Sequence, residues 1–459
     1  MSLPIAPERV LPTLNADGTR NRIRPRLYSG RLLRARRVVA YALMAIFVGL
    51  PLLRVDGKPA ILLDVVHRRF VLFGHTYLAT DGVLLMLLML SIFVGVVLLT
   101  ALVGRAWCGW ACPQTVYMEF LFRPIERLFE GPREAQLRLD RDGGGVRRLA
   151  KNAVYLGLAF VLANVFLAYF VGTDTLRHWV LQAPTEHWGG FLVVLVTTGL
   201  VFFDFAYFRE QMCTVICPYA RLQSVLLDPK SLLIGYDTAR GEPRSKGKAR
   251  QPGHGDCIDC QACVVACPTG IDIRQGLQLE CIACGQCADA CDSIMDRIKK
   301  PQGLIRYSSQ RALETGQQSS LLRPRVAIYS LALLGLLSAL AFASSGQERS
   351  EITVLRGLGA PFSRNGDDVV NQLRLRVQNR SDAEQTFRVE LLGVPGGKLV
   401  APELPLVVPA GELRNASFFV VAPASEVRGQ RRIQLRVSER SEQTLVPYTL
   451  LGPEGDAGP

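Results

Sequence analysis

Long apolar stretches are the first pattern along the chain. Five of them are nearly free of charge, and each approaches or reaches the roughly 17–25 residues that span a bilayer as a helix. They lie at residues 38–53, 83–103, 153–171, 191–208 and 326–343. The first also fits the apolar core of a signal peptide, but no small-residue cleavage site follows it cleanly, which favours an uncleaved anchor. The pattern predicts a membrane protein with an α-helical bundle of five transmembrane helices.

After the fifth apolar stretch the pattern changes to short alternation. Residues 371–378 and 432–437 alternate apolar with polar at every second position, which is typical of half-buried strands. With Pro and Gly turns between such strands, about a hundred residues suffice for an immunoglobulin-like sandwich. We therefore predict an all-β Ig-like domain over 346–459. This segment has no cysteine, and we expect it to serve docking or structure.

Positive charge is distributed unevenly around the predicted helices. The 459 residues carry a formal net charge of +13; residues 1–37 hold nine arginines and 104–150 hold eight, whereas 173–189 hold only Arg177. By the positive-inside rule, the basic N-terminus at 1–37 is cytoplasmic. Because the basic residues sit at membrane boundaries and form no single aromatic-rich patch, no nucleic acid partner is expected.

This orientation fixes the sides of the remaining segments. The four-helix membrane region, 38–208, returns the chain to the cytoplasm, so residues 209–325 form a cytoplasmic domain. The fifth helix, 326–345, then places the C-terminal domain on the opposite, periplasmic side. All twelve cysteines fall on or near the cytoplasmic side, which agrees with a reducing compartment.

Eight of these cysteines form two copies of the spacing C-x2-C-x2-C-x3-C. Thiolates at this spacing hold cubane iron–sulfur clusters, and the fourth cysteine of each run ligates the other cluster. Zinc sites usually group their ligands in two pairs, and disulfides need an oxidising compartment, so both alternatives fit less well. Two [4Fe-4S] clusters are predicted, one on Cys257, Cys260, Cys263 and Cys291, the other on Cys281, Cys284, Cys287 and Cys267.

The segment around these cysteines is expected to be an α+β ferredoxin-like module that moves electrons. The first run continues with Pro268, as in bacterial ferredoxins, whereas Asp292 follows the second. Residues 237–256 are rich in Gly, Lys, Arg and Pro, and this composition predicts a flexible linker into the module.

The other four cysteines form an internal repeat. Cys108 and Cys112 follow the second helix, and Cys213 and Cys217 follow the fourth, each pair in the pattern C-x3-C-P. Helical spacing would put both thiols of a pair on one face; alternatively, the proline opens a new helix and the cysteines lie on the turn that enters it. The four thiols are predicted to converge on one site that holds Cu(I) or a third iron–sulfur centre, or to act as two redox-active dithiols.

Several other side chains are weaker candidates. Asp204, inside the fourth helix, marks an ion or proton path or pairs with Arg209. Met86 and Met89 stand at helical spacing, but such residues usually form a packing surface, and no role is assigned to them. Four histidines in or beside the outer loops can bind metal, although solvated histidines are commoner there. They are His67, His75, His178 and His187.

These elements in this order resemble the cytochrome c oxidase accessory protein family of bacteria, known as CcoG, FixG or RdxA and encoded beside cbb3-type oxidase genes. The resemblance covers nearly the full chain. It rests on WCGWACPQ at 107–114, CTVICPYAR at 213–221, CPTGIDIR at 267–274 and the outer sandwich. It implies a multi-pass protein of the bacterial inner membrane that acts as a cupric reductase and delivers Cu(I) for assembly of the oxidase's copper centre.

The mechanism implied by this resemblance is electron entry at the paired clusters, transfer to the four membrane-face thiols and reduction of Cu(II) there. Reduction changes which ligands hold copper, because Cu(I) prefers thiolates and Cu(II) prefers nitrogen and oxygen. The implied partners are copper ion, membrane lipid, oxidase subunits or assembly factors, and an electron donor that the sequence does not identify. A homo-oligomer is compatible with this set.

Two other functions compete with this interpretation. The chain also resembles the polyferredoxin subunits of periplasmic nitrate and nitrous-oxide reduction systems, which suggests a quinol-oxidising relay to a periplasmic reductase. The outer sandwich distinguishes the two, because those relays lack it. A third possibility is a scaffold that docks the assembling oxidase, with its clusters as structural staples.

Overall fold

The structure is a computed structural model that describes residues 9–15, 17, 19–55, 57–66, 69–78, 82–143, 145–245, 253–316, 323–345, 350–381, 383–439 and 442–453. The chain divides into two compact units, Met1–Leu340 and Ala341–Pro459. The first unit holds the cysteines, and the second is all-β.

The prediction of five membrane helices is confirmed. Five helical segments among the described residues are long and apolar enough to cross a bilayer, and several begin earlier than the apolar runs alone suggest. They are Arg31–Leu52, Gly82–Val103, Gly145–Val171, Trp188–Phe208 and Pro324–Ser345. The corresponding helices are α1 (Arg31–Gly49) with the turn η1 (Leu50–Leu52), α2 (Gly82–Val103), α7 (Gly145–Val171), α9 (Trp188–Phe203) and α15 (Pro324–Ser345).

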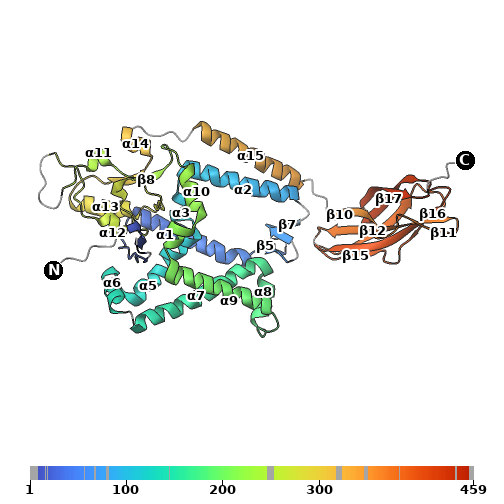
Figure 1. The fold of residues 1–459 in the computed structure, drawn as a ribbon, viewed down its shortest axis with the longest axis horizontal. Helices are drawn as coiled ribbons and strands as arrows, with labels where there is room; N and C mark the ends of the chain where they lie inside the picture. The colour runs from blue at the N-terminus through green and yellow to red at the C-terminus, as the bar shows by residue number, and fades with distance from the viewer. Residues whose placement is uncertain are drawn as a thin grey trace. The chain divides into compact units, whose positions relative to one another are not determined.

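Small elements connect these helices at one end of the first unit. Between α1 and α2 the chain forms short antiparallel strands, and helix α8 (Thr173–Val180) joins α7 to α9. In Figure 1 these connections lie opposite the end that carries α12 and α13. The strands are β3 (Arg54–Val55), β4 (Lys58–Pro59), β5 (Ile61–Asp64), β6 (Arg69–Leu72) and β7 (His75–Leu78).

The other end, here called the cysteine side, carries short helices and all cysteine motifs. The N-terminal strands β1 (Arg9–Leu11) and β2 (Leu14–Asn15) come before α1 in the chain. Two groups of short helices follow α2 and α9, and both include π-helical turns, which often mark functional sites. They are α3 (Ala106–Trp110), α4 (Pro113–Tyr117), η2 (Met118–Phe122), α5 (Arg123–Glu130), α6 (Arg133–Asp142), η3 (Asp204–Phe208), η4 (Met212–Ile216) and α10 (Pro218–Leu226).

A buried network of charges holds the two groups together. Arg209 donates to both carboxylate oxygens of Glu126, at 2.8 and 2.9 Å. Arg24 from the N-terminal segment also pairs with Glu126, and Lys151 lies 2.7 Å from Glu130. Buried charges are tolerated only when they are paired in this way.

The ferredoxin-like module mixes helices with a two-stranded sheet, as predicted. Strands β8 (Leu233–Tyr236) and β9 (Ile305–Ser308) pair antiparallel. The helices and turns of the module are α11 (Thr238–Gly241), α12 (Ala262–Ala266), η5 (Ile273–Gln275), α13 (Gln286–Arg297) and α14 (Gln310–Thr315). The predicted flexible linker is wrong where its residues are described: α11 forms there, and Arg240 donates to Asp256 at 2.7 Å. Residues 246–252 of that linker lie outside the described residues.

The second unit is the predicted sandwich. One sheet runs β10-β12-β16-β14, with β11 also paired to β12, and the other runs β15-β13-β17-β18. Inward side chains such as Leu373, Phe387, Phe418 and Leu435 form its core. The strands are β10 (Ser350–Arg356), β11 (Ser363–Asn365), β12 (Asp368–Asn379), β13 (Gln385–Leu392), β14 (Lys398–Val400), β15 (Leu406–Val408), β16 (Leu413–Pro423), β17 (Gln430–Glu439) and β18 (Glu442–Leu451).

Candidate iron–sulfur and thiol site

The two C-x2-C-x2-C loops have matching backbones. Asp259 and Ala283, each two residues after the first cysteine of its run, have positive φ angles of 51°, and Gln261 and Gly285, two residues later, have φ angles of 57° and 78°. Left-handed residues in such turns help to direct successive backbone N–H groups toward one point, which creates a concavity that suits anionic clusters. The repeat seen in the sequence is therefore also a repeat of backbone conformation.

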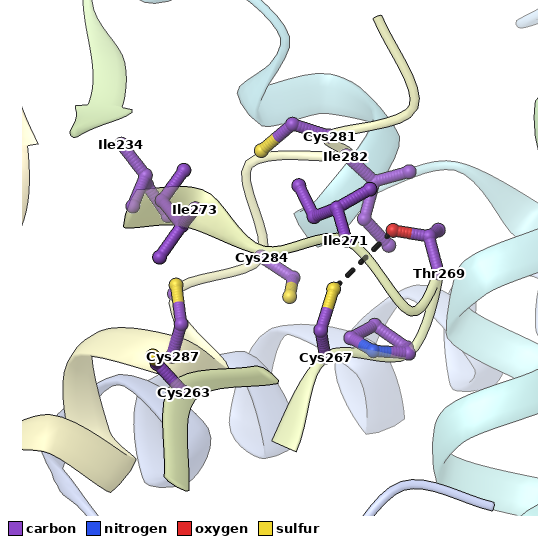
Figure 2. A pocket seen from close by; sticks show the side chains of 12 residues that line it. Ile234, Cys263, Cys267, Thr269, Ile271, Ile273, Cys281, Ile282, Cys284 and Cys287 are labelled. Atoms are coloured by element: carbon purple, nitrogen blue, oxygen red, sulfur yellow. Dashed lines mark hydrogen bonds between the residues drawn. The ribbon is translucent and has the colours of Figure 1, made fainter. Parts of the chain in front are cut away.

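The fourth cysteine of each run lies with the first three cysteines of the other run. Cys267 lines one pocket with Cys281, Cys284 and Cys287, and Figure 2 shows their sulfur atoms turned toward a common space. We call these four residues the second ferredoxin site. Cys291, the fourth cysteine of the second run, interacts electrostatically with the first three cysteines of the first run. This group is the first ferredoxin site: Cys257, Cys260, Cys263 and Cys291. The grouping is the one that the crossing rule assigns, and the role of each cysteine as a ligand stays a prediction.

The two ferredoxin sites differ in their access to solvent. Cys260 of the first site is exposed, whereas Cys267 and Cys284 of the second site are buried. Cys263 belongs to the first site and also lines the pocket of the second. The first site therefore reaches the surface of the module at Cys260, whereas no cysteine of the second site is exposed.

The cysteines of the C-x3-C-P motifs lie at breaks between helices. Cys112 is the N-cap of α4 and Cys217 the N-cap of α10, each followed by proline at the first helical position. Cys108 lies in the short helix α3, and Cys213 lies in the π-helical turn η4. The structure thus favours the second sequence interpretation, in which proline opens a new helix and fixes the turn that carries the thiol.

These four cysteines converge, and we call them the membrane thiol site. Every pair among them interacts electrostatically, so a negative charge on one sulfur raises the pKa of the next. The Cys108 thiol donates to Gln223 Oε1 at 3.1 Å. Burial raises the pKa of Cys108 to about 11 and that of Cys213 to about 12. Cys108 and Cys213 are therefore protonated at neutral pH unless a cation displaces their protons.

The membrane thiol site packs directly against the second ferredoxin site. Cys108 forms one apolar cluster with Ile282 and Cys284. A Cβ added at Gly109 would meet the Ile282 carbonyl oxygen at 2.5 Å and the Cys284 Cα at 2.8 Å. Only a residue without a side chain allows the two backbones to approach this closely.

Polar contacts reinforce the same junction. Trp110 Nε1 donates to the Tyr307 hydroxyl at 2.8 Å, and that hydroxyl donates to the Ala283 carbonyl at 2.5 Å. On the other side, Asp289 of α13 accepts from the backbone N–H of Leu32 and Leu33, at 3.1 and 2.7 Å. Since α1 has no side-chain cap of its own, the ferredoxin-like module supplies the cap for the first membrane helix.

The environment of Arg36, beside the membrane thiol site and the second ferredoxin site, fits an iron–sulfur cluster. Arg36 is fully buried, and its Nε donates to the Gly109 carbonyl at 2.9 Å. Its two terminal nitrogens have no hydrogen-bond partner among the described residues. Burial raises the pKa of Cys284 to about 11, and the charge of Arg36 opposes part of that rise. A buried guanidinium with free donors is costly unless an anion faces it, and a thiolate-bound cluster is such an anion.

A single bound ion fits less well than a cluster. Within the part of the chain that the structure describes, no three His, Cys, Asp or Glu side chains are close enough together to hold one metal ion.

The remaining sequence candidates separate into different environments. Asp204 accepts from Gln114 Nε2 at 3.1 Å, and among the described residues it makes no salt bridge, so its predicted pairing with Arg209 is wrong. His187 stacks on Trp179 with ring centroids 4.9 Å apart, and both His178 and His187 contact Gln182. His67 lies outside the described residues, and of His75 only the backbone is described.

Sequence reasoning missed Arg36, Asp289 and Gln223. Arg36 is one of nine arginines that the positive-inside rule explains collectively, so nothing distinguished it. Asp289 lies between two cluster cysteines on α13, and Gln223 follows Cys217 by six residues along α10. Only their positions relative to cysteine motifs could have drawn attention to them.

Three protein-family models match the chain. A 4Fe-4S dicluster domain matches residues 208–310, and a 4Fe-4S binding domain matches residues 85–132. A third model, described as an IG-like fold at the C-terminal of FixG, putative oxidoreductase, matches residues 340–453. The matches support iron–sulfur cofactors and an Ig-like second unit. The second match contains Cys108 and Cys112 and none of the ferredoxin cysteines.

Known proteins match over most of the chain. Protein RdxA of Cereibacter sphaeroides is 36% identical over 400 residues, which cover 82% of this chain and 83% of that protein. Nitrogen fixation protein FixG of Rhizobium meliloti is 32% identical over 427 residues, covering 83% and 81%. The crystal structure of a FixG-related protein from Vibrio parahaemolyticus covers 23% of this chain and 98% of that one, with 18% identity and a TM-score of 0.20.

Proposed function

Since the chain belongs to the FixG and RdxA family and is a membrane-bound iron–sulfur electron-transfer protein, we propose that it reduces Cu(II) to Cu(I) for assembly of the copper centre of a cbb3-type cytochrome c oxidase. The observation that supports this most is the contact between the membrane thiol site and the second ferredoxin site, at Cys108, Gly109 and Cys284. Soluble ferredoxin modules need no such partner, so the contact gives electrons a path between the membrane thiol site and the ferredoxin sites.

The three cysteine sites form an ordered series. The first ferredoxin site reaches the surface at Cys260, and its Cys263 also lines the pocket of the second ferredoxin site. The second ferredoxin site in turn contacts the membrane thiol site through Cys284. Iron–sulfur clusters, when bound at these cysteines, supply one-electron transfer over a potential range that easily includes copper reduction. We assign the two ferredoxin sites the crossed ligand sets given above, and the membrane thiol site a third iron–sulfur centre.

Copper is a substrate in this proposal. No described group of side chains is arranged to keep a single ion, which suits an ion that arrives, takes up one electron and leaves. Reduction lowers its preference for nitrogen and oxygen ligands and raises its preference for thiolates and thioethers. A carrier with such ligands can then take the ion, so we expect oxidase subunits or assembly factors as partners.

The proposed location is the bacterial inner membrane, with the cysteine side toward the cytoplasm. The distribution of arginine supports this orientation, since the N-terminal segment and the short helices after α2 are rich in arginine. The sandwich would then be periplasmic, where a partner protein can dock on it.

The test uses purified full-length protein whose clusters have been reduced and separated from excess reductant. Cu(II) is added together with a Cu(I)-specific chelator, and the rate at which the Cu(I) chelate forms is measured. We expect Cys108→Ser to lower this rate at least tenfold. Met89→Leu is the control, because it removes a different sulfur from the exposed surface of α2. No chelate from the reduced wild-type protein, or equal rates for wild type and Cys108→Ser, would overturn the proposal.

A further inference from the structure

A large apolar cavity opens beside the membrane thiol site. Its volume is about 530 Å³, within the range of ligand pockets. Helices α1, α4, α7 and α9 and the turns η3 and η4 contribute its walls. Aromatic side chains line much of it, including Phe47, Phe166 and Phe205, and flat rings of this kind favour another ring as a neighbour.

Besides Thr197, three polar side chains interrupt this apolar lining. Asp204 and Gln114 are hydrogen-bonded to each other at 3.1 Å, and the Gln114 amide also donates to the Arg209 carbonyl at 3.2 Å. Asp204 makes no salt bridge among the described residues, although the nearby Arg209 is paired twice with Glu126. An acid inside a membrane helix without a cationic partner is costly and usually functional.

Tyr117 is the third polar group and lies on α4. Its side chain is only 8% exposed, and its hydroxyl has no hydrogen-bond partner among the described residues. Buried hydroxyls nearly always have a partner. Tyr117 lines the cavity, but its hydroxyl oxygen is itself covered, so a rotation of the side chain would let a ligand in the cavity provide that partner.

The cavity and the membrane thiol site share backbone segments. Pro113 and Gln114 line the cavity directly after Cys112, while Met212 and Ile216 line it directly before Cys213 and Cys217. Asp204 lies close enough to Cys213 for its charge to act on that thiol. A ligand in the cavity is therefore next to the four sulfurs.

We propose that this cavity binds the head group of a lipid-soluble quinol, with its ring among Phe47, Phe166 and Phe205 and its hydroxyls at Asp204 and Tyr117. The proposal rests on the proposed function, for which it names the electron donor. A quinol suits the site because its ring is flat and apolar, it carries two oxygens, and it reaches the site from the lipid.

The chemistry balances with copper as the acceptor. One quinol loses two electrons and two protons and becomes a quinone, and two Cu(II) ions take up the electrons and become two Cu(I) ions. The Asp204 carboxylate accepts the first hydroxyl proton and passes it to water on the cysteine side, and it then accepts the second. Gln114 holds the carboxylate in place, and the Tyr117 hydroxyl binds the second quinol oxygen.

A phospholipid acyl chain is the competing occupant, because it also fills apolar cavities in membranes. It has no polar atom for Asp204 or Tyr117. The chain offers an internal comparison in a second cavity of about 720 Å³, lined by Asp174 on α8 among others. The Asp174 carboxylate is 80% exposed and pairs with Arg54. The second cavity therefore has an acidic side chain, but one that already has a cationic partner.

The first test measures binding with full-length protein in phosphatidylcholine nanodiscs, using decylubiquinone as the probe. We expect saturable binding that Asp204→Asn weakens at least tenfold and Tyr117→Phe about threefold. Asp204→Asn keeps an oxygen for Gln114 and so preserves the local hydrogen bond. Asp174→Asn is the matched control and should bind as the wild type does. Equal binding by wild type and Asp204→Asn, or saturation only at the second cavity, would overturn the proposal.

The second test separates this proposal from the proposed function. Decylubiquinol is added anaerobically in the absence of copper, and reduction of the protein is followed by its visible absorbance and by electron paramagnetic resonance. We expect reduction in the wild type and at least a tenfold slower reduction in Asp204→Asn. If chemically reduced protein makes Cu(I) but neither binds nor is reduced by the quinol, the quinol site is wrong and the reductase stands. If quinol reduces the protein but no Cu(I) forms, the reductase is wrong and the quinol site stands.

Discussion

Gly109→Ala tests the junction on which electron transfer between the membrane thiol site and the second ferredoxin site depends. The added methyl carbon would lie 2.5 Å from the Ile282 carbonyl oxygen, 2.8 Å from Cys284 Cα and 2.9 Å from Cys284 N. Real Cβ atoms essentially never approach other atoms closer than 3.0 Å. All three neighbours are backbone atoms of the loop that carries Cys281 and Cys284, so no side chain can rotate away, and the helix and the loop must separate.

The cost can be estimated from packing. An extra methyl group in a filled interior typically destabilises by about 1–3 kcal/mol, and replacing glycine by alanine in a helix returns about 0.5–1 kcal/mol. Gly157→Ala on α7 is the matched control, because its Cβ would meet nothing within 4 Å. We therefore expect Gly109→Ala to lose roughly 1–2 kcal/mol by these terms and Gly157→Ala to lose nothing or gain slightly.

Thermal unfolding in detergent, followed by tryptophan fluorescence, measures this difference. Trp107 and Trp110 flank Gly109, and Trp110 bonds across the junction to Tyr307, so the signal reports on the contact itself. At about 2–4 °C per kcal/mol, Gly109→Ala should unfold several degrees below Gly157→Ala and should slow chelate formation by reduced protein. Equal midpoints and equal rates for the two variants would show that the contact is not tight.

Three further predictions concern other parts of the first unit. Asp289→Ala should cost about 1–2 kcal/mol through loss of the helix cap and should speed hydrogen exchange at the amides of Leu32 and Leu33. Anaerobically purified wild-type protein should contain about twelve iron atoms per chain, and Cys108→Ser about eight; eight in both would exclude a third four-iron centre. Burial alone would raise the pKa of Glu126, but its cationic neighbours outweigh burial and hold that pKa well below the usual range. The ionised Glu126 therefore stabilises the folded protein above the unfolded-state pKa of about 4.3, and this stabilisation is lost as the pH falls below that value. Glu126→Gln should cost about 3–5 kcal/mol at neutral pH and flatten the acid limb of the stability profile; an unchanged limb would contradict this account.

Periodicity and spacing predicted the elements of this protein well because each depends on local physics. Apolar runs such as 83–103 leave a bilayer helix as the one way to satisfy the backbone, and alternation in 371–378 reflects one buried face of β12. The grouping of Cys267 with Cys281, Cys284 and Cys287 also followed from spacing, because short loops leave few ways to surround a cluster.

Contacts between distant segments could not be predicted in this way. The polar neighbour of Asp204 is Gln114, ninety residues earlier, whereas the sequence pointed to the nearby Arg209. Arg209 was unavailable because Glu126, from a helix of the other repeat, takes its guanidinium. Such choices depend on which helices pack together, and hydropathy carries no information about that.

The same long-range packing explains why the membrane thiol site is tied to one ferredoxin site and not to both. Arg36 reaches from α1 to the Gly109 carbonyl, and Asp289 reaches from α13 back to the start of α1. One helix therefore fixes both the thiol-bearing turn and the module that carries the second ferredoxin site. Because neither contact involves a cysteine, we expect the relative position of the two sites to be set by the protein before any metal is bound. Loss of either contact should then impair electron delivery while leaving the iron content unchanged.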